Sequence, residues 1–371
     1  MSKEIGTKKI VHIFQGYSYH LTPNISSSFL KNLPEYNHII VLYGPRNMNK
    51  DIYSSLYSKS SFNDYIYCCN LFQLARIFIR YRKDVIIFHA GMYSWKFLAF
   101  FLRCNNINWV CWGHGASVGI SFLGKRITAL KQFLYKQFKT IDVLIPQDKI
   151  SIEKYYQVPA ENIWNISYMG NFSEENTDLY DKLRKTTTFP KNGKPLVLLG
   201  NNPSNIPNYI DLLKQLSIFK GKILVQCMLH YSLEKNKLYY ELIELGKSIF
   251  GEDFRSNEEF YEFKDYILYM SKCDIYICSG KQQTGLGAIN TCLRLGKKIY
   301  ITGKNYDWIT NHYKAIVYRC DDINENLTYE SFVKELSVEE KEYNNKCLDS
   351  STSEVSIVKH WQKYFDFLLN T

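Results

Sequence analysis

A histidine flanked by glycines has the setting of a residue that transfers protons. Residues 111–117 read Cys-Trp-Gly-His-Gly-Ala-Ser and follow an apolar run. The glycines expose the imidazole of His114, and an imidazole titrates near neutral pH, so it can take a proton from a reacting hydroxyl. Most single histidines have no catalytic role. We predict that His114 is a general base, with His89 and His20, which stand in comparable positions, as alternatives.

The loop 279–287, Ser-Gly-Lys-Gln-Gln-Thr-Gly-Leu-Gly, has the composition of an anion-binding segment. It lies between an apolar segment ending at Cys278 and a helix expected over Ala288–Leu295. Free N–H groups and the positive end of the helix dipole at such a loop favour a diphosphate. The plain alternative is a tight turn whose glycines only satisfy backbone geometry. We predict that a bound diphosphate contacts this loop through Lys281, Gln282, Gln283, Thr284, Gly285 and Gly287.

A second donor-rich loop, 200–205, reads Gly-Asn-Asn-Pro-Ser-Asn and follows another apolar segment. Small and amide residues here allow hydrogen-bond donors to approach a second face of the same diphosphate. The alternative is an ordinary helix N-cap turn, to which Ser204 is well suited. We predict that Gly200, Asn201, Asn202 and Ser204 belong to the same diphosphate-binding site.

Metal and cofactor motifs are absent from the sequence. No Asp-x-Asp motif occurs, so a carboxylate-held Mg²⁺ on the diphosphate is not indicated. The ten cysteines lack metal-type spacing, and several lie within apolar segments, which favours free, reduced thiols. We therefore expect no metal and no cofactor, and the loops, the helix dipole and Lys281 must neutralise the charge of a leaving group.

Short apolar strands alternate with helices in both halves of the chain, which predicts two parallel sheets covered on both faces. In such sheets ligands bind beyond the carboxyl ends of the strands, where all three loops stand. The expected strands are Ile10–Phe14, His38–Tyr43, Val85–His89, Trp109–Trp112, Val143–Pro146, Leu196–Leu199, Lys222–Cys227, Asp274–Cys278 and Lys298–Thr302. The expected helices include Leu71–Tyr81, Trp95–Leu102, Ile127–Phe138, Tyr209–Leu216, Leu238–Ile249 and Val355–Leu369.

The length of 371 residues fits two domains. The polar, Thr- and Lys-rich segment 171–194 has no apolar period and predicts a linker. We expect a Rossmann-like domain over 1–170, a second Rossmann-like domain over 195–354, and a helix over 355–371 that packs back across the junction.

Composition limits the class of protein and its partners. The chain has 46% hydrophobic and 22% charged residues, and no apolar run long enough to span a bilayer. Its N-terminus lacks the pattern of a secretory signal, so we expect a cytoplasmic protein. The net charge of +10 is compatible with an anionic membrane surface or an anionic substrate, whereas the absence of zinc-finger or RNP-like motifs disfavours nucleic acid.

At the same loops the sequence resembles the TDP-N-acetylfucosamine:lipid II N-acetylfucosaminyltransferase family, which extends the lipid-linked intermediate of enterobacterial common antigen. The similar stretches are IIFHAG (86–91), NWVCWG (108–113), VLLGNN (197–202), YEFKDYILYMSKCDI (261–275) and KQQTGLG (281–287), followed by a Gly-Lys-Lys segment and Trp308. Thr284 lengthens the glycine loop by one residue, and 113–117 lacks the acidic residue that the family places after Trp-Gly.

This resemblance implies a GT-B fold with an acceptor-binding domain over 1–170 and a nucleotide-sugar-binding domain over 195–354. The implied donor is a nucleotide-diphosphate sugar, and the implied acceptor is a polyprenyl-diphosphate-linked saccharide. The expected activity is transfer of a deoxyhexose or amino-deoxyhexose from a TDP- or UDP-sugar, in O-antigen or enterobacterial common antigen synthesis. A teichoic-acid-type phosphate-group transferase and a catalytically silent sugar-nucleotide-binding protein are the alternatives.

Two basic amphipathic segments, Arg76–Lys83 and Lys125–Lys139, suggest where such an enzyme works. In the second, Ile127, Leu130, Leu134 and Phe138 recur at helical spacing among lysines. Such helices more often pack on their own sheet and leave their lysines in solvent. Because the implied acceptor is lipid-linked, we predict peripheral binding to the anionic inner face of the cytoplasmic membrane.

Overall fold

The chain divides into two compact units that are each continuous in space. The computed structural model describes residues 8–15, 22–44, 65–91, 94–113, 116, 132–168, 174–186, 193–200, 206–229, 235–259 and 261–370. Unit 1 consists of residues 1–170 and 354–371, and unit 2 consists of residues 171–353. The chain therefore passes between the units twice.

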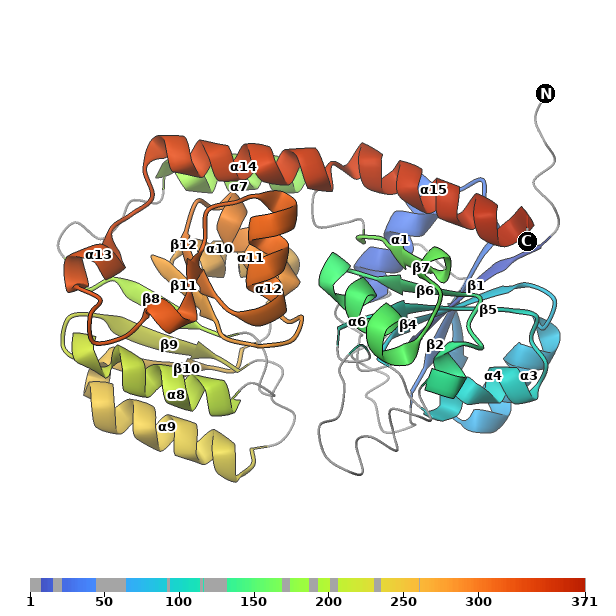
Figure 1. Ribbon diagram of the computed structural model, residues 1–371, viewed down its shortest axis with the longest axis horizontal. Coiled ribbons are helices and arrows are strands. Elements are labelled where there is room, and N and C mark those ends of the chain that lie inside the picture. The colour runs from blue at the N-terminus through green and yellow to red at the C-terminus, as the bar shows by residue number, and fades with distance from the viewer. Residues whose placement is uncertain are drawn as a thin grey trace. The chain divides into compact units, whose positions relative to one another are not determined.

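Unit 1 is built on a parallel sheet of seven strands in the order β3-β2-β1-β4-β5-β6-β7 (Figure 1). The strand order reverses between β1 and β4, which is the arrangement of a doubly wound sheet. Its strands are β1 (Ile10–Gln15), β2 (His38–Tyr43), β3 (Tyr65–Cys68), β4 (Val85–Ala90), β5 (Asn106–Cys111), β6 (Thr140–Val143) and β7 (Ile163–Asn165).

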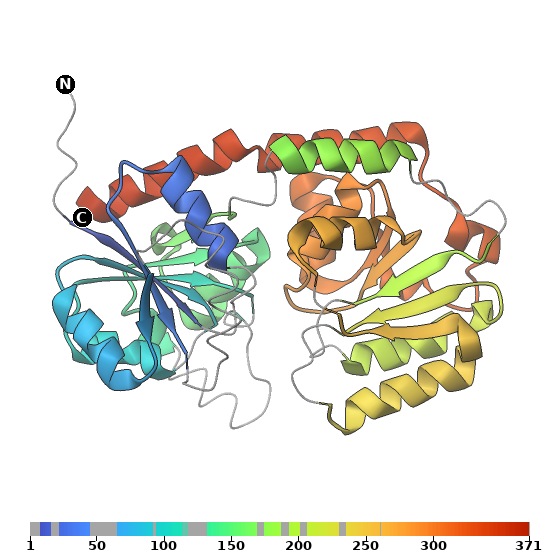
Figure 2. The same ribbon diagram turned by 180° about the vertical axis from the view of Figure 1, so that it is seen from behind.

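Unit 2 repeats this architecture with six parallel strands in the order β10-β9-β8-β11-β12-β13 (Figure 2). The reversal here lies between β8 and β11. The strands are β8 (Leu196–Leu199), β9 (Leu224–Met228), β10 (Phe254–Asn257), β11 (Ile275–Cys278), β12 (Lys298–Ile301) and β13 (Tyr318–Arg319). The prediction of two Rossmann-like units with parallel sheets is thereby confirmed.

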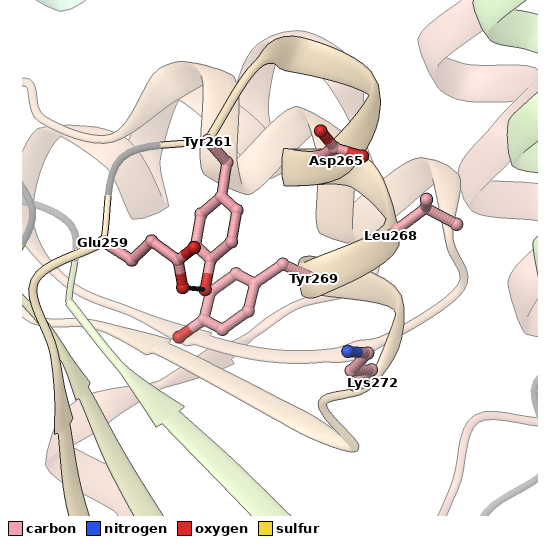
Figure 3. Close-up of a pocket in the computed structure, with 6 residues that line it drawn as sticks. All are labelled: Glu259, Tyr261, Asp265, Leu268, Tyr269 and Lys272. Atoms are coloured by element: carbon pink, nitrogen blue, oxygen red, sulfur yellow. Dashed lines mark hydrogen bonds between the residues drawn. The ribbon is translucent and has the colours of Figure 1, made fainter.

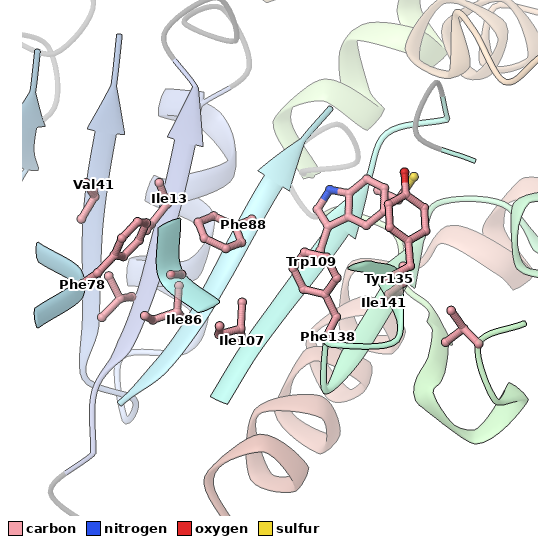
Figure 4. Packing of buried hydrophobic residues seen from close by; sticks show 14 of the residues in the cluster. Ile13, Val41, Phe78, Ile86, Phe88, Ile107, Trp109, Tyr135, Phe138 and Ile141 are labelled. Carbon is pink, nitrogen blue, oxygen red and sulfur yellow. The ribbon is translucent and has the colours of Figure 1, made fainter. Parts of the chain in front are cut away.

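Alternate residues of the unit 1 strands form one apolar core (Figure 4). Val11, Ile13, Phe88 and Trp109 point to the face covered by helix α3 (Leu71–Arg80). Helix α3 begins after Asn70, whose side chain accepts a hydrogen bond from the N–H of Gln73. Its residues Leu74, Ile77 and Phe78 are spaced by three and one, so they form a single buried stripe.

The opposite face of the unit 1 sheet is covered by α1 (Thr22–Asn32) and by α15 (Glu354–Asn370), which returns from the other end of the chain (Figures 1 and 2). Polar contacts fix α15 in place. The hydroxyl of Tyr36 donates to Asp366 at 2.8 Å, and the amide of Asn106 donates to the Leu368 carbonyl at 2.8 Å. Trp361 also donates its indole N–H to the carbonyl of Ser167 at 2.9 Å.

In unit 2, α8 (Ile206–Leu216) and α9 (Lys237–Phe250) cover one face of the sheet (Figure 1). Helices α10 (Phe263–Ser271) and α11 (Leu286–Arg294) cover the other, with α7 (Glu174–Thr186) and α14 (Val338–Thr352) packed against them. Helix α7 occupies much of the segment 171–194 that its polar composition marked as a linker. Its Tyr180 is buried and contacts the hydroxyl of Thr291 on α11 at 3.3 Å.

Several element boundaries differ from the sequence prediction, and two of these differences have a clear physical reason. The strand expected over Val143–Pro146 is β6 (Thr140–Val143), and Pro146 instead begins helix α6 (Pro146–Tyr156), because a proline suits a first helical turn. Strand β5 begins at Asn106 rather than Trp109, since the buried amides of Asn106 and Asn108 find hydrogen-bond partners there. The remaining elements are α4 (Leu98–Phe101), α12 (Gly303–Trp308) and α13 (Tyr329–Val333), with short 3₁₀ and π turns. No helix within the described ranges is both long and apolar enough to cross a membrane.

Candidate functional site

The two predicted donor loops of unit 2 start side by side. Strands β8 and β11 pair at the point where the strand order reverses, with Leu199 opposite Ile277. Gly200 follows directly, and its N–H donates to the Ile277 carbonyl at 2.8 Å. This geometry brings the start of the 200–205 loop next to the loop that follows Cys278. Asn201, Asn202 and Ser204 lie outside the described residues.

Gly200 also has a structural role. Its φ of +76° lies in the left-handed region, and a Cβ atom placed on it would lie 2.3 Å from Cζ of Tyr209. A glycine is therefore required for the backbone to pass over this buried ring. The residue needs no ligand contact to explain its presence.

The loop 279–285 presents its predicted donor residues to solvent and ends at a helix. Lys281 and Gln282 are exposed, whereas Gln283 and Thr284 are half-buried. Gly285, at φ 64°, is the N-cap of α11 and has no side chain to cap the first N–H groups. The loop thus places a cation and two amides beside an uncapped helix N-terminus, which suits a phosphate group.

A buried asparagine from a later helix fixes the middle of this loop. The Asn305 amide donates to the carbonyl of Thr284 at 2.7 Å, and its oxygen accepts from the N–H of Thr284 at 3.4 Å. Asn305 has no exposed surface. The N–H of Lys304 also donates to the Lys281 carbonyl at 3.2 Å. The start of α12 therefore holds the backbone of the donor loop from behind.

Polar atoms at the same place remain unsatisfied. The hydroxyl of Ser279, which is 7% exposed, and the side-chain oxygen of Gln283 have no hydrogen-bond partner among the described residues. Buried polar atoms in proteins are almost always paired, and an orphan of this kind marks a position that a ligand or water completes. Two orphans on one loop point to a polar ligand.

Gly303 offers a direct test of the support behind the loop. Its φ is +60°, and a Cβ atom would lie 2.3 Å from the Lys281 carbonyl oxygen. We expect Gly303→Ala to displace the loop and to lower stability by about 1–3 kcal/mol, through left-handed strain and the clash. Calorimetry should show weaker binding of UDP.

The matched control for this prediction is Gly221→Ala. Gly221 also has a left-handed φ, of +78°, but nothing lies within 4 Å of the added Cβ. This variant should lose some stability and keep its affinity for UDP. Equal UDP affinities for both variants would contradict the proposed support of the loop.

In unit 1, the segment containing the predicted base follows the end of β5. Cys111 ends the strand, Trp112 is half-buried, and Gly113 has a φ of 54°. His114 itself and the alternative His20 lie outside the described residues. The strand nevertheless delivers the residues that follow it to the carboxyl edge of the sheet, where doubly wound sheets bind ligands.

The other alternative base, His89, lies in the interior. It has no exposed surface, and its ring nitrogens lie 3.1 Å from a nitrogen of His12 and 2.5 Å from the hydroxyl of Tyr168. Burial, with a smaller effect of the nearby Lys96, holds the pKa of His89 well below its usual value. A neutral imidazole with both nitrogens engaged has no free position for a substrate proton, so this geometry disfavours His89.

A shallow pocket of about 300 Å³ lies along α10, after the end of β10 (Figure 3). The rings of Tyr261 and Tyr269 stack in it with centroids 4.8 Å apart, and Tyr261 donates to Glu259 at 2.9 Å. Asp265, Leu268 and Lys272 complete its lining. None of the predicted donor residues that the structure describes lines this pocket.

Comparison with known proteins relates the chain by fold. No family model and no curated protein matches the sequence. A glycosyltransferase from Rickettsia africae ESF-5 aligns with a TM-score of 0.63 at 12% identity, over 98% of this chain and 99% of that one. Anabaena HepE in complex with UDP and glucose aligns with a TM-score of 0.66 at 10% identity, over 97% and 99%.

A third solved structure with this architecture is an epimerase. The UDP-GlcNAc 2-epimerase from Neisseria meningitidis, bound to UDP-GlcNAc, aligns with a TM-score of 0.56 at 13% identity, over 98% of this chain and 100% of that one. Together with the two parallel sheets, these alignments show that the chain has the GT-B fold, as predicted. At such identities they establish the fold alone.

Sequence reasoning missed the residues that support the two sites. Asn305 and Ser279 complete the donor loop, and His12 and Tyr168 surround His89. Only Ser279 carries a signal in the sequence, because a small polar residue directly follows the apolar strand. The other three gain their partners from segments distant in the chain.

Proposed function

We propose that the chain is a glycosyltransferase that moves a deoxyhexose or amino-deoxyhexose from a TDP- or UDP-sugar to a lipid-linked saccharide. The observation that carries this proposal is the loop 279–285, where unsatisfied polar atoms, Lys281 and an uncapped helix meet at the reversal of a GT-B sheet. The resemblance in 261–287 supports the donor and acceptor classes.

In this reaction the acceptor hydroxyl attacks the anomeric carbon of the donor while the bond to the nucleoside diphosphate breaks. His114 takes the proton from the hydroxyl as the new glycosidic bond forms. Lys281, the amides of Gln282 and Gln283, and the first N–H groups of α11 stabilise the departing diphosphate. We propose that this stabilisation operates without a divalent metal.

Product analysis tests the reaction type. The protein, a set of UDP- and TDP-sugars and a short-chain lipid-linked saccharide are incubated in excess EDTA, and the products are measured by mass spectrometry. Addition of one sugar to the acceptor supports the proposal. A phosphodiester product supports the phosphate-group transferase, and binding without turnover supports the silent sugar-nucleotide-binding protein. Conversion of a UDP-sugar to its epimer without acceptor would indicate chemistry like that of the epimerase.

Replacing both Gln282 and Gln283 by Ala tests the donor loop. Each amide is expected to donate to a charged oxygen, and such a bond contributes about 1.5–3 kcal/mol. Their joint loss should weaken UDP or TDP binding by roughly 2–4 kcal/mol, measured by calorimetry. Gln215→Ala, at an exposed position on α8, is the matched control and should bind normally. Unchanged affinity in the double variant would show that this loop does not bind the diphosphate.

We further propose that unit 1 binds an anionic membrane surface through α3. Phe72 is 67% exposed and Ile79 is 54% exposed on this helix, and the guanidinium of Arg76 lies 4.5 Å from the centroid of the Phe72 ring. Phe101 on the adjoining α4 is 81% exposed. Large apolar side chains among basic residues are typical of helices that lie in a membrane interface.

The second basic segment, Lys125–Lys139, contributes less support to this proposal. Only its last residues are described, and there Phe138 is buried in the core of unit 1. The apolar stripe thus packs on its own sheet at that point. Lys136 remains exposed, with its amine 3.2 Å from the side-chain oxygen of Gln157.

The protein is therefore expected to sediment with anionic vesicles at low salt and to be released at high salt. Each basic residue near an anionic leaflet contributes about 1 kcal/mol. Phe72→Ser with Arg76→Gln and Arg80→Gln should abolish sedimentation. Ile218→Ser with Lys214→Gln, exposed on unit 2, is the matched control. Equal binding to neutral and anionic vesicles would contradict the proposal.

A further inference from the structure

A continuous chain of hydrogen bonds runs beneath α15 through three histidines. A nitrogen of His38 lies 3.0 Å from one of His12, and the other nitrogen of His12 lies 3.1 Å from His89. His89 reaches the hydroxyl of Tyr168 at 2.5 Å, and that hydroxyl accepts from the indole N–H of Trp112 at 3.0 Å. At its other end the chain reaches the Leu33 carbonyl, 3.1 Å from Nε2 of His38.

The two ends of this chain fix the position of every proton in it. A carbonyl can only accept, so Nε2 of His38 must carry its proton, and Nδ1 is left to accept from Nε2 of His12. The same reasoning places the proton of His89 on Nε2. Tyr168 then donates to Nδ1 of His89, and its oxygen is free to accept from Trp112, which can only donate.

Packing holds the rings in this arrangement. The ring of Phe14 stacks on His89 at 4.1 Å with an angle of 8°, and Phe29 stacks on His12 at 4.7 Å. The ring of Phe365 on α15 lies edge-on to His12 at 5.9 Å. The titratable groups that face this hydrogen-bond chain include Lys96, Glu35 and Asp142. The Lys96 amine donates to the His89 carbonyl, Glu35 lies near His38, and Asp142 lies near Tyr168.

The hydrogen-bond chain ends at Trp112, which lies at the carboxyl edge of the sheet. Buried polar networks are unfavourable unless all of their members are satisfied, and fully satisfied ones fix a unique geometry. Here that geometry sets the ring plane of Trp112, directly after β5. Because its N–H is engaged by Tyr168, the half-buried indole has no free polar group, so a ligand that contacts its exposed part meets only ring atoms.

We propose that Trp112 is the platform on which a pyranose ring of the acceptor stacks, and that Tyr168, His89, His12 and His38 are positioning residues that fix its plane. This inference rests on the proposed function for the identity of the ligand. The apolar C–H face of a pyranose matches an aromatic ring face, and stacking of this kind requires a fixed ring orientation more than a charge.

The hydrogen-bond chain can be tested without any ligand. In protein with ¹⁵N-labelled histidine, long-range ¹H–¹⁵N spectra at pH 7 should show His12, His38 and His89 all protonated at Nε2. Tyr168→Phe should shift the indole N–H resonance of Trp112 and the Nδ1 resonance of His89. A proton on Nδ1 in any of the three histidines would overturn the chain as described.

The platform is tested with N-acetylglucosamine octyl diphosphate, a water-soluble analogue of a lipid-linked saccharide, in the absence of donor. Binding to the native protein should shift the pyranose C–H proton resonances upfield by the ring current. Trp112→Leu should abolish this shift and weaken binding at least fivefold, whereas Trp112→Phe should retain part of both. Trp164→Phe, another half-buried tryptophan of unit 1, should behave as the native protein.

Several outcomes would decide the proposal. Tyr168→Phe should raise the acceptor KM while leaving UDP affinity unchanged, and kcat at saturating acceptor should stay near normal. Equal binding of the probe to Trp112→Leu, no binding to the native protein, or a fall in kcat at unchanged acceptor KM would overturn the platform. Binding that depends on Trp112 without any sugar transfer would support the Trp112 platform and contradict the proposed glycosyltransferase activity.

Discussion

Replacement of His114 by Ala or Asn should lower kcat by about 10²–10⁴, the usual contribution of a general base. The structure supports this expectation through the strand that precedes the residue. Strand β5 is buried along its whole length and delivers residue 113, at a φ of 54°, to the carboxyl edge of the sheet. His114 is the next residue in the sequence, so we expect it at this edge, where doubly wound sheets bind ligands.

The melting temperature separates catalysis from folding in this experiment. Because His114 is flanked by glycines, its substitution should change the free energy of unfolding little. His312→Ala, at an exposed position of unit 2, is the matched control and should leave kcat unchanged. Near-normal kcat in His114→Ala would transfer the role of base to His20 or to an acidic residue.

A second large effect is expected on stability as the pH falls. Burial lowers the pKa of His38 from 6.5 to about 4, while a hydrogen bond to Leu33 and the charge of Glu35 oppose this shift. The pKa values of His12 and His89 are also well below normal, mainly because of burial. Each of these imidazoles is therefore neutral in the folded protein near neutral pH.

The sign of the effect follows from proton uptake. Below pH 6.5 the unfolded chain binds protons on these histidines and the folded chain does not, so the free energy of unfolding decreases. The stability is full above about pH 6.5 and is lost as the pH falls towards 4. For His38 alone the loss is about 3 kcal/mol, and His12 and His89 add to it.

Urea unfolding at pH 7, 6 and 5 measures this loss. His38→Gln is the informative variant, because an amide can accept from His12 and donate to Leu33 but does not titrate. The free energy of unfolding of this variant should fall less steeply as the pH decreases. The slope should correspond to up to one proton fewer taken up on unfolding. The buried Asp142, whose raised pKa acts in the opposite direction, is common to both proteins and cancels in the comparison. His312→Gln should retain the native slope, and an identical slope in His38→Gln would contradict the assignment.

The sequence predicts the fold of this chain well because its strands are simple apolar runs. Val85–Ala90 is buried from end to end, Leu196–Leu199 is buried except for the half-buried Leu196, and a glycine follows each strand. Such punctuation marks the carboxyl ends of the strands, and so the loop 279–285 could be placed correctly. Strand β5 was less predictable, because Asn106 and Asn108 are polar in sequence and depend on distant partners, the Leu368 carbonyl for Asn106 and the Thr140 hydroxyl for Asn108.

The supporting residues could not be predicted because their partners are distant. His12 lies within the apolar run IVHIF, where the sequence offers no reason to distinguish it from a core residue. Its role depends on His38 and His89, which are 26 and 77 residues away. Asn305 likewise acts by donating to the carbonyl of Thr284, from which it is separated in sequence by a helix and a strand. The residues of a binding loop can be recognised from adjacent sequence. The residues that support the loop come from distant segments and are brought to it only when the protein folds.

The return of α15 to unit 1 has a consequence for the order in which the protein is synthesised. A ribosome completes β1 to β7 long before it reaches residue 354, and the intervening 171–353 take roughly 10–40 s at usual rates of elongation. During this interval the surface that carries His12 and Phe29 has no α15 to cover it. The nascent chain must therefore keep this face from wrong contacts while unit 2 folds, which makes it the expected place for a chaperone to bind.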